Sequence, residues 1–568
     1  MYVELHCHSN FSLLDGASHP EELVEQAAAL GMSALALTDH DAVYGVPRFI
    51  QAAERVDIKP LVGAELTFED GHHLTLLVEN QAGWHNLCYL ISRGRHQAEK
   101  GEAALPFEEL VGCTEGLIAL SGCRHGHLAA ALLANRRGVA LQWARRYRRL
   151  FGDDHFFIEL QHHQRPDDQF LVTCLVNLAS YLQLPIVATN NVHYATQDRY
   201  QLQNVLVAIR HNQPLSAVHA QQYPNSEYYL KTAADLCPFF PREALTNTAV
   251  IAERCYFELA YGLQDLPIYP TPHGMSSGAY LRRLCLQALS QRYGDKGTET
   301  ARAHLDHELN IIEQSGLANY FLIVWDIVRF AHEQGIRCQG RGSAAGSLVA
   351  YLLQISPIDP LAHGLVFERF LSAERSVTPD IDIDFDAARR EEVIQYLYQR
   401  YGEAHTAMAC TFVTFRRRSA LRDVARALDL SPETVAAATA HLDDATNSAN
   451  QDNSQITQLL ALCEQIQGFP RHLGIHNGGM IITASPLMGR MPTEPATMAA
   501  RTVVQWDKEG LEQAGLVKID VLGLRMLSAI DEAVRLVAEE RGRQGEGEKG
   551  GQGEVLPRTF DDPAVYEM

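Results

Sequence analysis

The sequence predicts an α/β protein: a (β/α) barrel-like domain at its amino end, followed by an α+β domain that contains an inserted helical segment. Over about the first 200 residues, short apolar runs alternate with amphipathic stretches, which is typical of an α/β sheet. Histidines and carboxylates stand where most of these runs end. In TPDIDIDFD (378–386), aspartates occupy every second position, which is the period of a β-strand.

The composition suits a folded protein of several domains. The chain has 568 residues, more than one hydrophobic core usually supports, with 46% hydrophobic and 21% charged residues. It contains no run of about 18 apolar residues and no signal-peptide pattern, so we expect a cytoplasmic protein without a membrane partner. The eleven scattered cysteines include no C-x-x-C pair, which fits a reduced compartment. The net charge of −21 argues against non-specific nucleic-acid binding, although a basic groove can exist within an acidic total.

The expected strands of the first domain follow one another at short intervals. They are YVELHCH (2–8), SALALTDH (33–40), KPLVGAEL (59–66), HLTLLVE (73–79), GLIALSGC (116–123), FFIELQHH (156–163) and PIVATNNVHY (185–194). Helices are expected between several of them, as at 20–31 and 170–182. This alternation predicts a parallel sheet or barrel, in which polar residues at the carboxyl ends of the strands meet in one site.

Those polar residues form a mixed set of nitrogen, oxygen and sulfur ligands. His6 and His8 are two residues apart and therefore point the same way on a strand. The full set is His6, His8, Asp15, Asp39, His40, Glu65, His73, Cys123 and His193. Such a set suits zinc, manganese or iron, and two or three metals could activate water and promote attack on a phosphate ester. The plainer alternative is a scatter of unrelated core and surface histidines.

The motifs HCHSNFSLLDGA, ALTDHDAVYG, VGAEL, HLTLLVEN, LSGC and ATNNVHY resemble the polymerase-and-histidinol-phosphatase (PHP) domain of bacterial DNA polymerases. The resemblance implies zinc or manganese held by His6, His8, Asp15, His40, Glu65, His73, Cys123 and His193. The family pattern has an aspartate where this chain has Asn191. Because an amide is neutral and a poorer ligand, the departure implies that one metal is weakened or lost.

The second half of the chain is expected to be mainly helical around a few strands. A buried helix is expected at 320–335, a helix within GRGSAAGSLVAYLL (340–353), helices over 410–467, and strands in 471–483 and 516–524. The Gly- and charge-rich stretch 541–554 is expected to be a flexible insertion. In GRGS, Gly340 and Gly342 allow the backbone to approach a ligand, and the following helix start would offer N–H groups to phosphate. An ordinary turn is the alternative.

The aspartate strand predicts a site for cations. Asp380, Asp382 and Asp384 share one face, and the apolar residues between them face the other way. Carboxylates this close repel one another unless a cation lies among them, and Mg²⁺ prefers carboxylate and phosphate oxygens. Two such ions would stabilise the attacking and leaving oxygens in phosphoryl transfer. A solvated strand edge is the alternative.

Several arginines are candidates for phosphate contacts. Arg418, Arg422 and Arg426 are spaced i, i+4, i+8 within 414–428, opposite an apolar stripe and with no acidic partner at the same spacing. This pattern suits a nucleic-acid backbone, or else a solvated helix face. Arg369 in FERF and Arg375 in ERSVTPD could contact phosphates or form ordinary salt bridges.

The motifs GRGSAAGSLVAYLL, LVFERFLSAERSVTPDIDIDF, GIHNGGMIIT and VKIDVLGLR resemble the palm of the bacterial C-family DNA polymerases. The family comprises the replicative polymerase III alpha subunit and its error-prone relative, and the compact start MYVELHCHSNFS favours the latter. The resemblance implies attack of a primer 3′-hydroxyl on the α-phosphate of a nucleotide. By resemblance, the ligands of catalytic Mg²⁺ are Asp380, Asp382 and Asp520, and the nucleotide's phosphates are held by Gly342, Ser343 and Lys518.

The resemblance also implies a domain order. We expect the PHP core at 1–200, a mostly helical connection at 201–315, palm at 316–411 and 481–530, a thumb at 412–480, and the start of the fingers at 531–568. The expected partners are primer-template DNA and deoxynucleotides. We further expect a chain truncated before the fingers, with a separate carboxy-terminal half and, through it, a sliding clamp. The alternatives are a metal-dependent phosphoesterase or 3′–5′ exonuclease in the first domain, or a PHP domain that is structural only.

Overall fold

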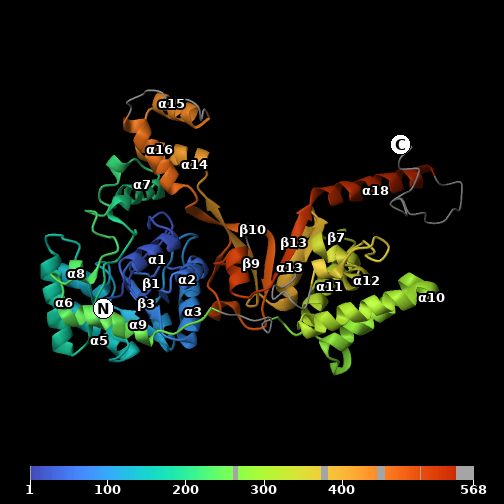
Figure 1. Cartoon of the computed structure of the whole chain (residues 1–568), viewed down its shortest axis with the longest axis horizontal. Helices are drawn as coiled ribbons and strands as arrows, with labels where there is room; N and C mark the ends of the chain where they lie inside the picture. The colour runs from blue at the N-terminus through green and yellow to red at the C-terminus, as the bar shows by residue number, and fades with distance from the viewer. Residues whose placement is uncertain (1, 260–265, 372–380, 444–453, 499, 545–568) are drawn as a thin grey trace. The chain divides into compact units, whose positions relative to one another are not determined.

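The computed structural model describes residues 2–259, 266–371, 381–443, 454–498 and 500–544, which fall into two compact units (Figure 1). The first unit comprises Met1–Ala260, Ala409–Ile475 and Pro486–Ala514, and the second comprises Tyr261–Met408, His476–Ser485 and Gly515–Met568. The chain passes from one unit to the other within β9 (Thr406–Thr414) and again within β10 (Pro470–Ile482). These divisions cut across the expected domain boundaries, which stay a prediction.

The first unit is built on a six-stranded sheet whose strands follow their order in the sequence. The strands are β1 (Ala34–Leu37), β2 (Lys59–Thr67), β3 (His73–Val78), β4 (Leu117–Leu120), β5 (Phe156–Leu160) and β6 (Ile186–Ala188). The pairs β1–β2, β4–β5 and β5–β6 are parallel, but β3 is antiparallel to both of its neighbours. The expectation of a parallel sheet is therefore wrong at β3, because the connection from β2 is too short for a crossover helix and forms a hairpin instead.

The first apolar run, 2–8, is extended but is not a full strand of this sheet. Glu4 forms a parallel bridge with Leu35 of β1, and Cys7 forms one with Val192, just after β6. The same short segment thus touches both ends of the sheet and curls it. The predicted barrel-like form of the first domain is confirmed, and its strand ends converge.

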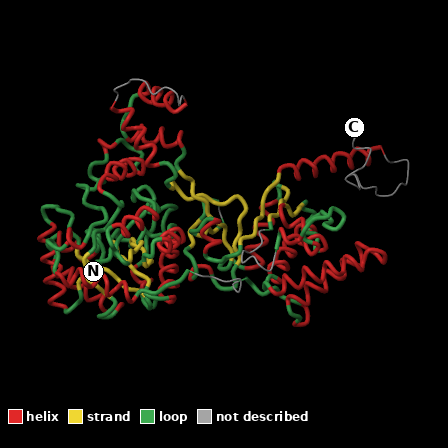
Figure 2. Tube along the Cα trace, viewed as in Figure 1, coloured by secondary structure: helices red, strands yellow, loops and turns green. Residues whose placement is uncertain are grey.

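Helices pack around this sheet (Figure 2). They start where the sequence supplies caps: Pro20 opens α1 after His19, whose backbone N–H donates to Glu22, and the Asn80 side chain accepts N–H groups at the start of α3. The helices are α1 (Pro20–Ala29), α2 (Val46–Arg55), α3 (Gln81–Gln97), α4 (His127–Leu133), α5 (Arg137–Phe151), α6 (Asp168–Leu182), α7 (Tyr200–Arg210), α8 (Ala233–Leu236) and α9 (Arg242–Arg254).

The inserted helical segment packs on α7 and belongs to the first unit. Its helices are α14 (Arg417–Ala427), α15 (Pro432–Asp443) and α16 (Ser454–Ile466). One hydrophobic cluster joins Leu202 and Leu206 of α7 to Val424 of α14 and Leu459 of α16. The unit is completed by β11 (Thr493–Pro495), β12 (Thr502–Val504) and α17 (Lys508–Gln513).

The strands of the second unit belong to a seven-stranded sheet, in which β10, β13 (Lys518–Leu524), β8 (Asp382–Asp386) and β7 (Cys338–Arg341) are neighbours in that order. β13 and β8 are parallel, and each has an antiparallel partner on its other side. The helices are α10 (Ser277–Gln314), α11 (Ala318–Glu333), α12 (Leu348–Leu352), α13 (Arg390–Tyr401) and α18 (Arg525–Gln544). The buried helix predicted at 320–335 is confirmed as α11. The expected flexible insertion begins within α18, and its remainder lies outside the described residues.

A buried carboxylate joins α11 to α13 and to the segment before α10. The Asp326 side chain on α11 is fully buried and accepts hydrogen bonds from the hydroxyls of Tyr269 and Tyr396, at 3.1 and 2.7 Å. Arg329 and Arg400 form ion pairs with it at 2.6 and 3.3 Å. The charge is thus paired and hydrogen-bonded, as burial requires. Among the helices described, none is long and apolar enough to cross a membrane.

His127, at the start of α4, provides a test of the first unit's stability against pH. Its Nε2 lies 2.9 Å from Asp70 Oδ2 and its Nδ1 lies 2.8 Å from the Tyr147 hydroxyl, which a neutral ring satisfies by donating to the former and accepting from the latter. Burial lowers the pKa of His127 to about 4, despite the hydrogen bond to Asp70. Between pH 6.5 and 4, His127 therefore binds a proton in the unfolded chain but not in the folded chain. The free energy of unfolding consequently falls as pH falls.

We expect His127 to account for a loss of about 2 kcal/mol between pH 6.5 and pH 4, measurable by urea unfolding. His127→Gln should flatten the pH dependence over this window. His155→Gln, which removes a half-exposed imidazole paired with Glu79, should leave the slope as in the wild type. Equal slopes for the wild type and His127→Gln would contradict the assignment.

Candidate functional sites

The first candidate site is a cluster of side chains in the first unit, where the ends of the sheet strands converge. The amino-terminal segment supplies two histidines, and the others come from β2 and β3 or from the loops around and after the strands. The cluster comprises His6, His8, Asp15, His40, Glu65, His73, Cys123 and His193. All eight residues that the sequence and the family resemblance single out thus lie together.

Glu65 is the centre of this cluster. Its Oε1 lies 3.5 Å from His6 Nε2 and 3.2 Å from His73 Nδ1, and its Oε2 lies 3.6 Å from His8 Nε2 and 3.1 Å from His40 Nδ1. Burial alone would raise the pKa of Glu65, but His73 and His6 outweigh it and hold that pKa well below its ordinary value. One ionised, buried carboxylate therefore faces four imidazoles.

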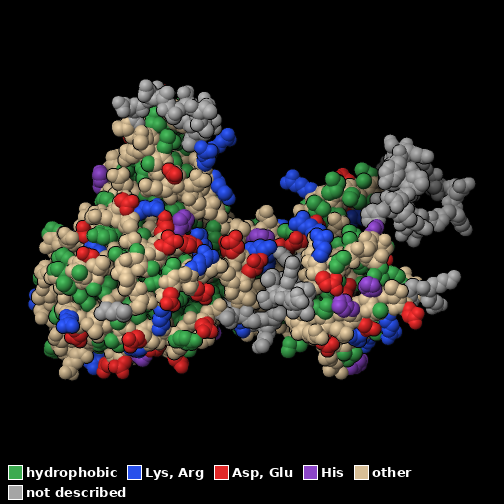
Figure 3. All heavy atoms as spheres, viewed as in Figure 1, with side chains coloured by type: hydrophobic (Ala, Val, Ile, Leu, Met, Phe, Trp, Pro, Cys, Tyr) green, Lys and Arg blue, Asp and Glu red, His purple; other side chains and the backbone are tan. Residues whose placement is uncertain are grey.

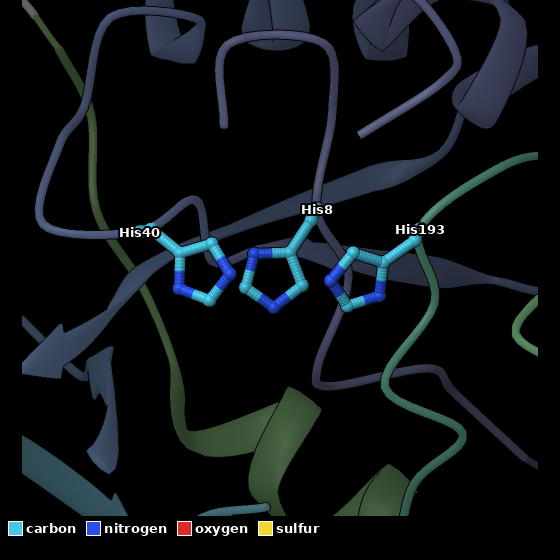
Figure 4. A group of neighbouring side chains, drawn as sticks. All are labelled: His8, His40 and His193. Carbon is cyan, nitrogen blue, oxygen red and sulfur yellow. The ribbon is translucent and has the colours of Figure 1, made fainter. Parts of the chain in front are cut away.

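Three of the histidines form a row. The His8 ring lies between those of His40 and His193, stacked on them with centroid distances of 4.2 and 4.4 Å (Figure 4). Burial, with the neighbouring His40 and His193, lowers the pKa of His8 well below its ordinary value, which favours the neutral ring that binds metals. His193 Nδ1 lies 2.9 Å from the Asn191 carbonyl, and its Nε2 lies 2.6 Å from the Tyr223 hydroxyl and 4.0 Å from Asp15 Oδ2.

The cluster fits divalent metal ions. Three groups of its ligand atoms each lie within 4.8 Å of one another: His8, His40 and His193; His6, His8 and Glu65; and His40, Glu65 and His73. His6 Nε2, His8 Nε2 and Glu65 Oε1 are buried and have no hydrogen-bond partner among the described residues. Because buried polar atoms are nearly always hydrogen-bonded, three such ligand atoms without a hydrogen bond in one place point to cations. The nitrogen, oxygen and sulfur donors suit transition metals.

Sequence reasoning missed Glu159, and it misplaced Asp39. Glu159 is 1% exposed and lies 2.7 Å from His6 Nδ1, so it orients His6 in the manner of a carboxylate behind a metal-bound histidine. It stands near the end of the apolar run 156–163, where the strand-end rule could have found it. Asp39 accepts hydrogen bonds from Ser9 and Ser12 and holds their loop, so its carboxylate is a structural group.

A cleft of about 1030 Å³ opens onto the cluster within the first unit. Its wall includes Arg124, Arg165 and Arg210, and Arg210 Nη1 lies 3.3 Å from Asp15 Oδ2. Asn191 also lines the cleft, and its buried Oδ1 has no hydrogen-bond partner in the described part of the chain. A site with ligand atoms at its base and arginines on its wall can accept an anionic group.

Asn191→Asp is expected to increase the metal bound by the first unit. The substitution places a charged carboxylate where a neutral amide now faces the cleft, and carboxylates are the better ligands. The metal content of purified wild type and variant, measured by mass spectrometry, would check this. Asn190→Asp is the matched control, because the Asn190 side chain instead donates to the carbonyls of Glu227 and Tyr229. Equal metal content in wild type and Asn191→Asp would refute the expectation.

The second candidate site lies on the sheet of the second unit. Asp382 of β8 and Asp520 of β13 are direct register partners on adjacent parallel strands. Asp384 is 4% exposed, two residues along β8 from Asp382. The intervening apolar side chains, Ile381, Ile383 and Phe385, are fully buried. The predicted alternation is confirmed for the described residues, while Asp380 lies outside them.

Two cations accompany these acids. Lys518 Nζ forms an ion pair with Asp520 Oδ2. Arg341 of β7 places Nε 3.6 Å from Asp382 Oδ2 and Nη1 3.6 Å from Asp384 Oδ1. Arg341 was missed although it stands within GRGS, since only the strand pairing brings it opposite Asp382. Asp520 Oδ1 is buried and has no hydrogen-bond partner among the residues described, so the acids fit a divalent cation as well.

Backbone geometry explains why both glycines of GRGS lack a side chain. A Cβ at Gly340 would lie 2.6 Å from the Ile355 carbonyl oxygen, and Gly342 has φ of +71°, where a side chain is disfavoured. Gly342 opens a 3-10 turn, Gly342–Gly346, and not the helix itself. The expectation that the helix start is open to phosphate is wrong for α12, because its first N–H groups donate to the buried Glu308.

The remaining predicted arginines differ in their surroundings. Arg369 is exposed in a short 3-10 turn, and Arg375 lies outside the described residues. Lys and Arg side chains gather beside α14 (Figure 3), and its basic stripe, Arg418, Arg422 and Arg426, is exposed as predicted. The expectation concerned acidic residues at the same helical spacing; the structure adds a partner outside that spacing, because Arg422 Nε lies 3.1 Å from the buried Asp423, its neighbour in sequence. Arg426 donates to the Asn212 side chain.

Comparison with known proteins links both sites to described families. Residues 4–163 match the PHP domain, and residues 279–523 match the bacterial DNA polymerase III alpha NTPase domain. The chain is 41% identical over 95% of its length to an error-prone DNA polymerase of Symbiobacterium thermophilum, covering 52% of that protein. It is 40% identical over its whole length to error-prone DNA polymerases of Mycobacterium bovis and Pseudomonas aeruginosa, covering 53% and 54% of them. The chain therefore spans about half the length of the curated relatives it matches.

Proposed function

We propose that the chain belongs to the bacterial C-family DNA polymerases, with their PHP domain at its amino end, and that its second unit holds the catalytic acids of a DNA-directed DNA polymerase of the alpha-subunit type. The substrates would be primer-template DNA and deoxynucleotides. The names of the relatives favour the error-prone branch and, with it, synthesis across damaged templates. A separate carboxy-terminal half and a sliding clamp remain candidate partners.

The observation that carries this proposal is the register of Asp382 beside Asp520, flanked by Lys518. We assign Asp380, Asp382 and Asp520 as the residues that hold Mg²⁺. When bound, Mg²⁺ would supply positive charge at the attacking and leaving oxygens. Asp384, buried on the same strand, supports the arrangement by pairing with Arg341.

The residues around the acids would hold the nucleotide. Gly342 and Ser343 form the start of the 3-10 turn that follows β7, so their backbone can lie close to a triphosphate. Lys518 carries its charge beside Asp520 and would bind the same phosphates, and Arg369 and Arg375 would add further contacts. Holding the α-phosphate in line with a primer hydroxyl contributes to the rate by orientation alone.

The basic stripe on α14 would bind the DNA backbone. Arg418 and Arg422 are exposed along one helix face, and Arg426 continues it. Since Arg422 and Arg426 already have protein partners, Asp423 and Asn212, these partners would orient the guanidinium groups toward phosphate. Binding of this kind weakens as salt concentration rises.

Primer extension tests the main proposal. The assay uses this chain alone and with a separately supplied carboxy-terminal half, with a labelled primer-template, four deoxynucleotides and Mg²⁺. Template-directed extension that depends on this chain would support the proposal. Nucleotide incorporation that is the same with and without this chain would overturn it.

The intact cluster around Glu65 favours a second function, a metal-dependent phosphoesterase or 3′–5′ exonuclease in the first unit. Zinc or manganese is our proposal for the metal, held by the eight residues of the cluster. When bound, such ions would activate a water molecule. Arg124, Arg165 and Arg210 would hold the phosphate. Release of nucleotides from single-stranded DNA by the wild type, lost in His8→Ala, would support it; a chain with no bound metal and no release would leave the PHP domain structural.

A further inference from the structure

Glu308 is a buried carboxylate near the carboxyl end of α10 that accepts hydrogen bonds from the start of α12. Its side chain is 4% exposed. Oε1 accepts the Leu348 N–H at 2.8 Å, and Oε2 accepts the Val349 N–H at 3.0 Å and the Ser347 hydroxyl at 2.9 Å. Burying a carboxylate is costly, and here it is compensated by the unpaired N–H groups and positive dipole end of a helix.

The cap on α12 lies directly after the turn that follows β7, so it affects where that turn lies. α12 has only five residues, so a cap on its first turn determines where the element lies. A single residue, Ser347, separates the end of the 3-10 turn Gly342–Gly346 from the first residue of α12. The turn's other end is held by β7, where Gly340 N–H donates to the Ile355 carbonyl at 2.6 Å and Arg341 pairs with Asp382 in register.

We propose that Glu308 is a positioning residue for nucleotide binding: it fixes the far end of the turn Gly342–Gly346 and thereby sets that turn against Asp382. The inference rests on the proposed polymerase function and deepens it. Glu308 does not touch the nucleotide, since its carboxylate is occupied by α12. Its effect is transmitted through Ser347, Leu348 and Val349, which begin immediately after the turn.

Glu308→Gln separates this role from a merely structural one. Glutamine has one side-chain oxygen, so it cannot accept all three hydrogen bonds, and its amide N–H₂ faces other donors. Burial raises the pKa of Glu308 to about 7. Because Glu308→Gln leaves buried donors without an acceptor, thermal stability is expected to fall whether or not Glu308 positions the turn. A loosened turn, in contrast, weakens nucleotide binding.

The experiment measures binding of a fluorescent deoxynucleotide to this chain in Mg²⁺, together with thermal unfolding and amide hydrogen exchange at 342–349. For Glu308→Gln we expect a Kd about tenfold higher, which corresponds to about 1.4 kcal/mol, and faster exchange in the turn. Ser347→Ala removes one of the three hydrogen bonds to Glu308 and also the Ser347 cap on the Ala350 N–H. It should shift the Kd in the same direction by about threefold, or roughly 0.7 kcal/mol. Glu313→Gln, an exposed site on the same helix, is the matched control and should change nothing.

The outcomes distinguish the two proposals. If the wild type binds nucleotide and Glu308→Gln and Ser347→Ala bind it equally well, the positioning role is refuted while the nucleotide site stands. If the wild type does not bind nucleotide, or if Asp382→Asn binds it as well as the wild type does, the nucleotide site itself is refuted, and the positioning role with it. Should Glu308→Gln fail to fold, Ser347→Ala alone decides between an unchanged and a raised Kd.

Discussion

Replacing Glu65 by glutamine is expected to lower the affinity of the first unit for its divalent metal by about 100-fold or more, since even removing a residue behind a ligand costs 10- to 100-fold. Glu65 lies within 3.6 Å of imidazole nitrogens on four histidines, and no other carboxylate of the cluster has so many. Glutamine keeps the size of the side chain but removes the charge that the cations require.

Metal analysis after dialysis and thermal unfolding would measure the effect. At a metal concentration 100 times its Kd, loss of binding lowers the free energy of unfolding by about 2.7 kcal/mol, and a chelator should bring the wild type to the same value. Glu79→Gln is the matched control, because Glu79 pairs with His155 and Arg254 outside the cluster. Retained metal in Glu65→Gln would refute the assignment of Glu65 as the central ligand.

Asp382→Asn and Asp520→Asn are each expected to reduce nucleotide incorporation by about 10³-fold, comparable with the loss of one strong electrostatic contact to a transition state. The two carboxylates are register partners, so either change removes half of the pair proposed to hold Mg²⁺. The measurement is single-turnover primer extension by this chain together with the separately supplied carboxy-terminal half. Binding of Mn²⁺ to the second unit is a readout that does not depend on activity.

Asp386→Asn is the matched control for these variants. Asp386 follows Asp382 and Asp384 at the same two-residue spacing on β8, but its Oδ1 accepts hydrogen bonds from the Ala388 N–H and the Ser528 hydroxyl. Its replacement should cost stability and leave the rate of incorporation within a few fold. Incorporation at the wild-type rate by Asp382→Asn would remove that residue from the catalytic set.

Much of the first site could be read from the sequence because strand ends carry their own signal. His6, His8, Glu65 and His193 each stand in or just after an apolar run, and such ends meet wherever a sheet curls. The antiparallel direction of β3 was not predictable from periodicity, since a strand has the same alternation in either direction. Its direction follows from the short hairpin connection.

In the second site, too, some features could be predicted from the sequence and others could not. The alternation around Asp382 is local and could be read directly, because residues two apart on a strand share a face. That Asp520 is its register partner, that Arg341 faces it, and that Glu308 caps α12 depend on pairings between segments far apart in the chain. Similarity of motifs implied that Asp520 joins Asp382 in one site, but it gave no strand register, and no spacing rule indicates the other two.

The amino-acid sequence thus settles which chemical groups are present. It also settles which of them share a face, because side chains repeat every two residues along a strand and every 3.6 residues along a helix. Folding settles which faces meet. The convergence of His6, His40, Glu65 and His193 and the register of β13 beside β8 arise from packing and strand pairing. These are long-range interactions, and their partners are selected by the whole core and not by neighbours in the chain.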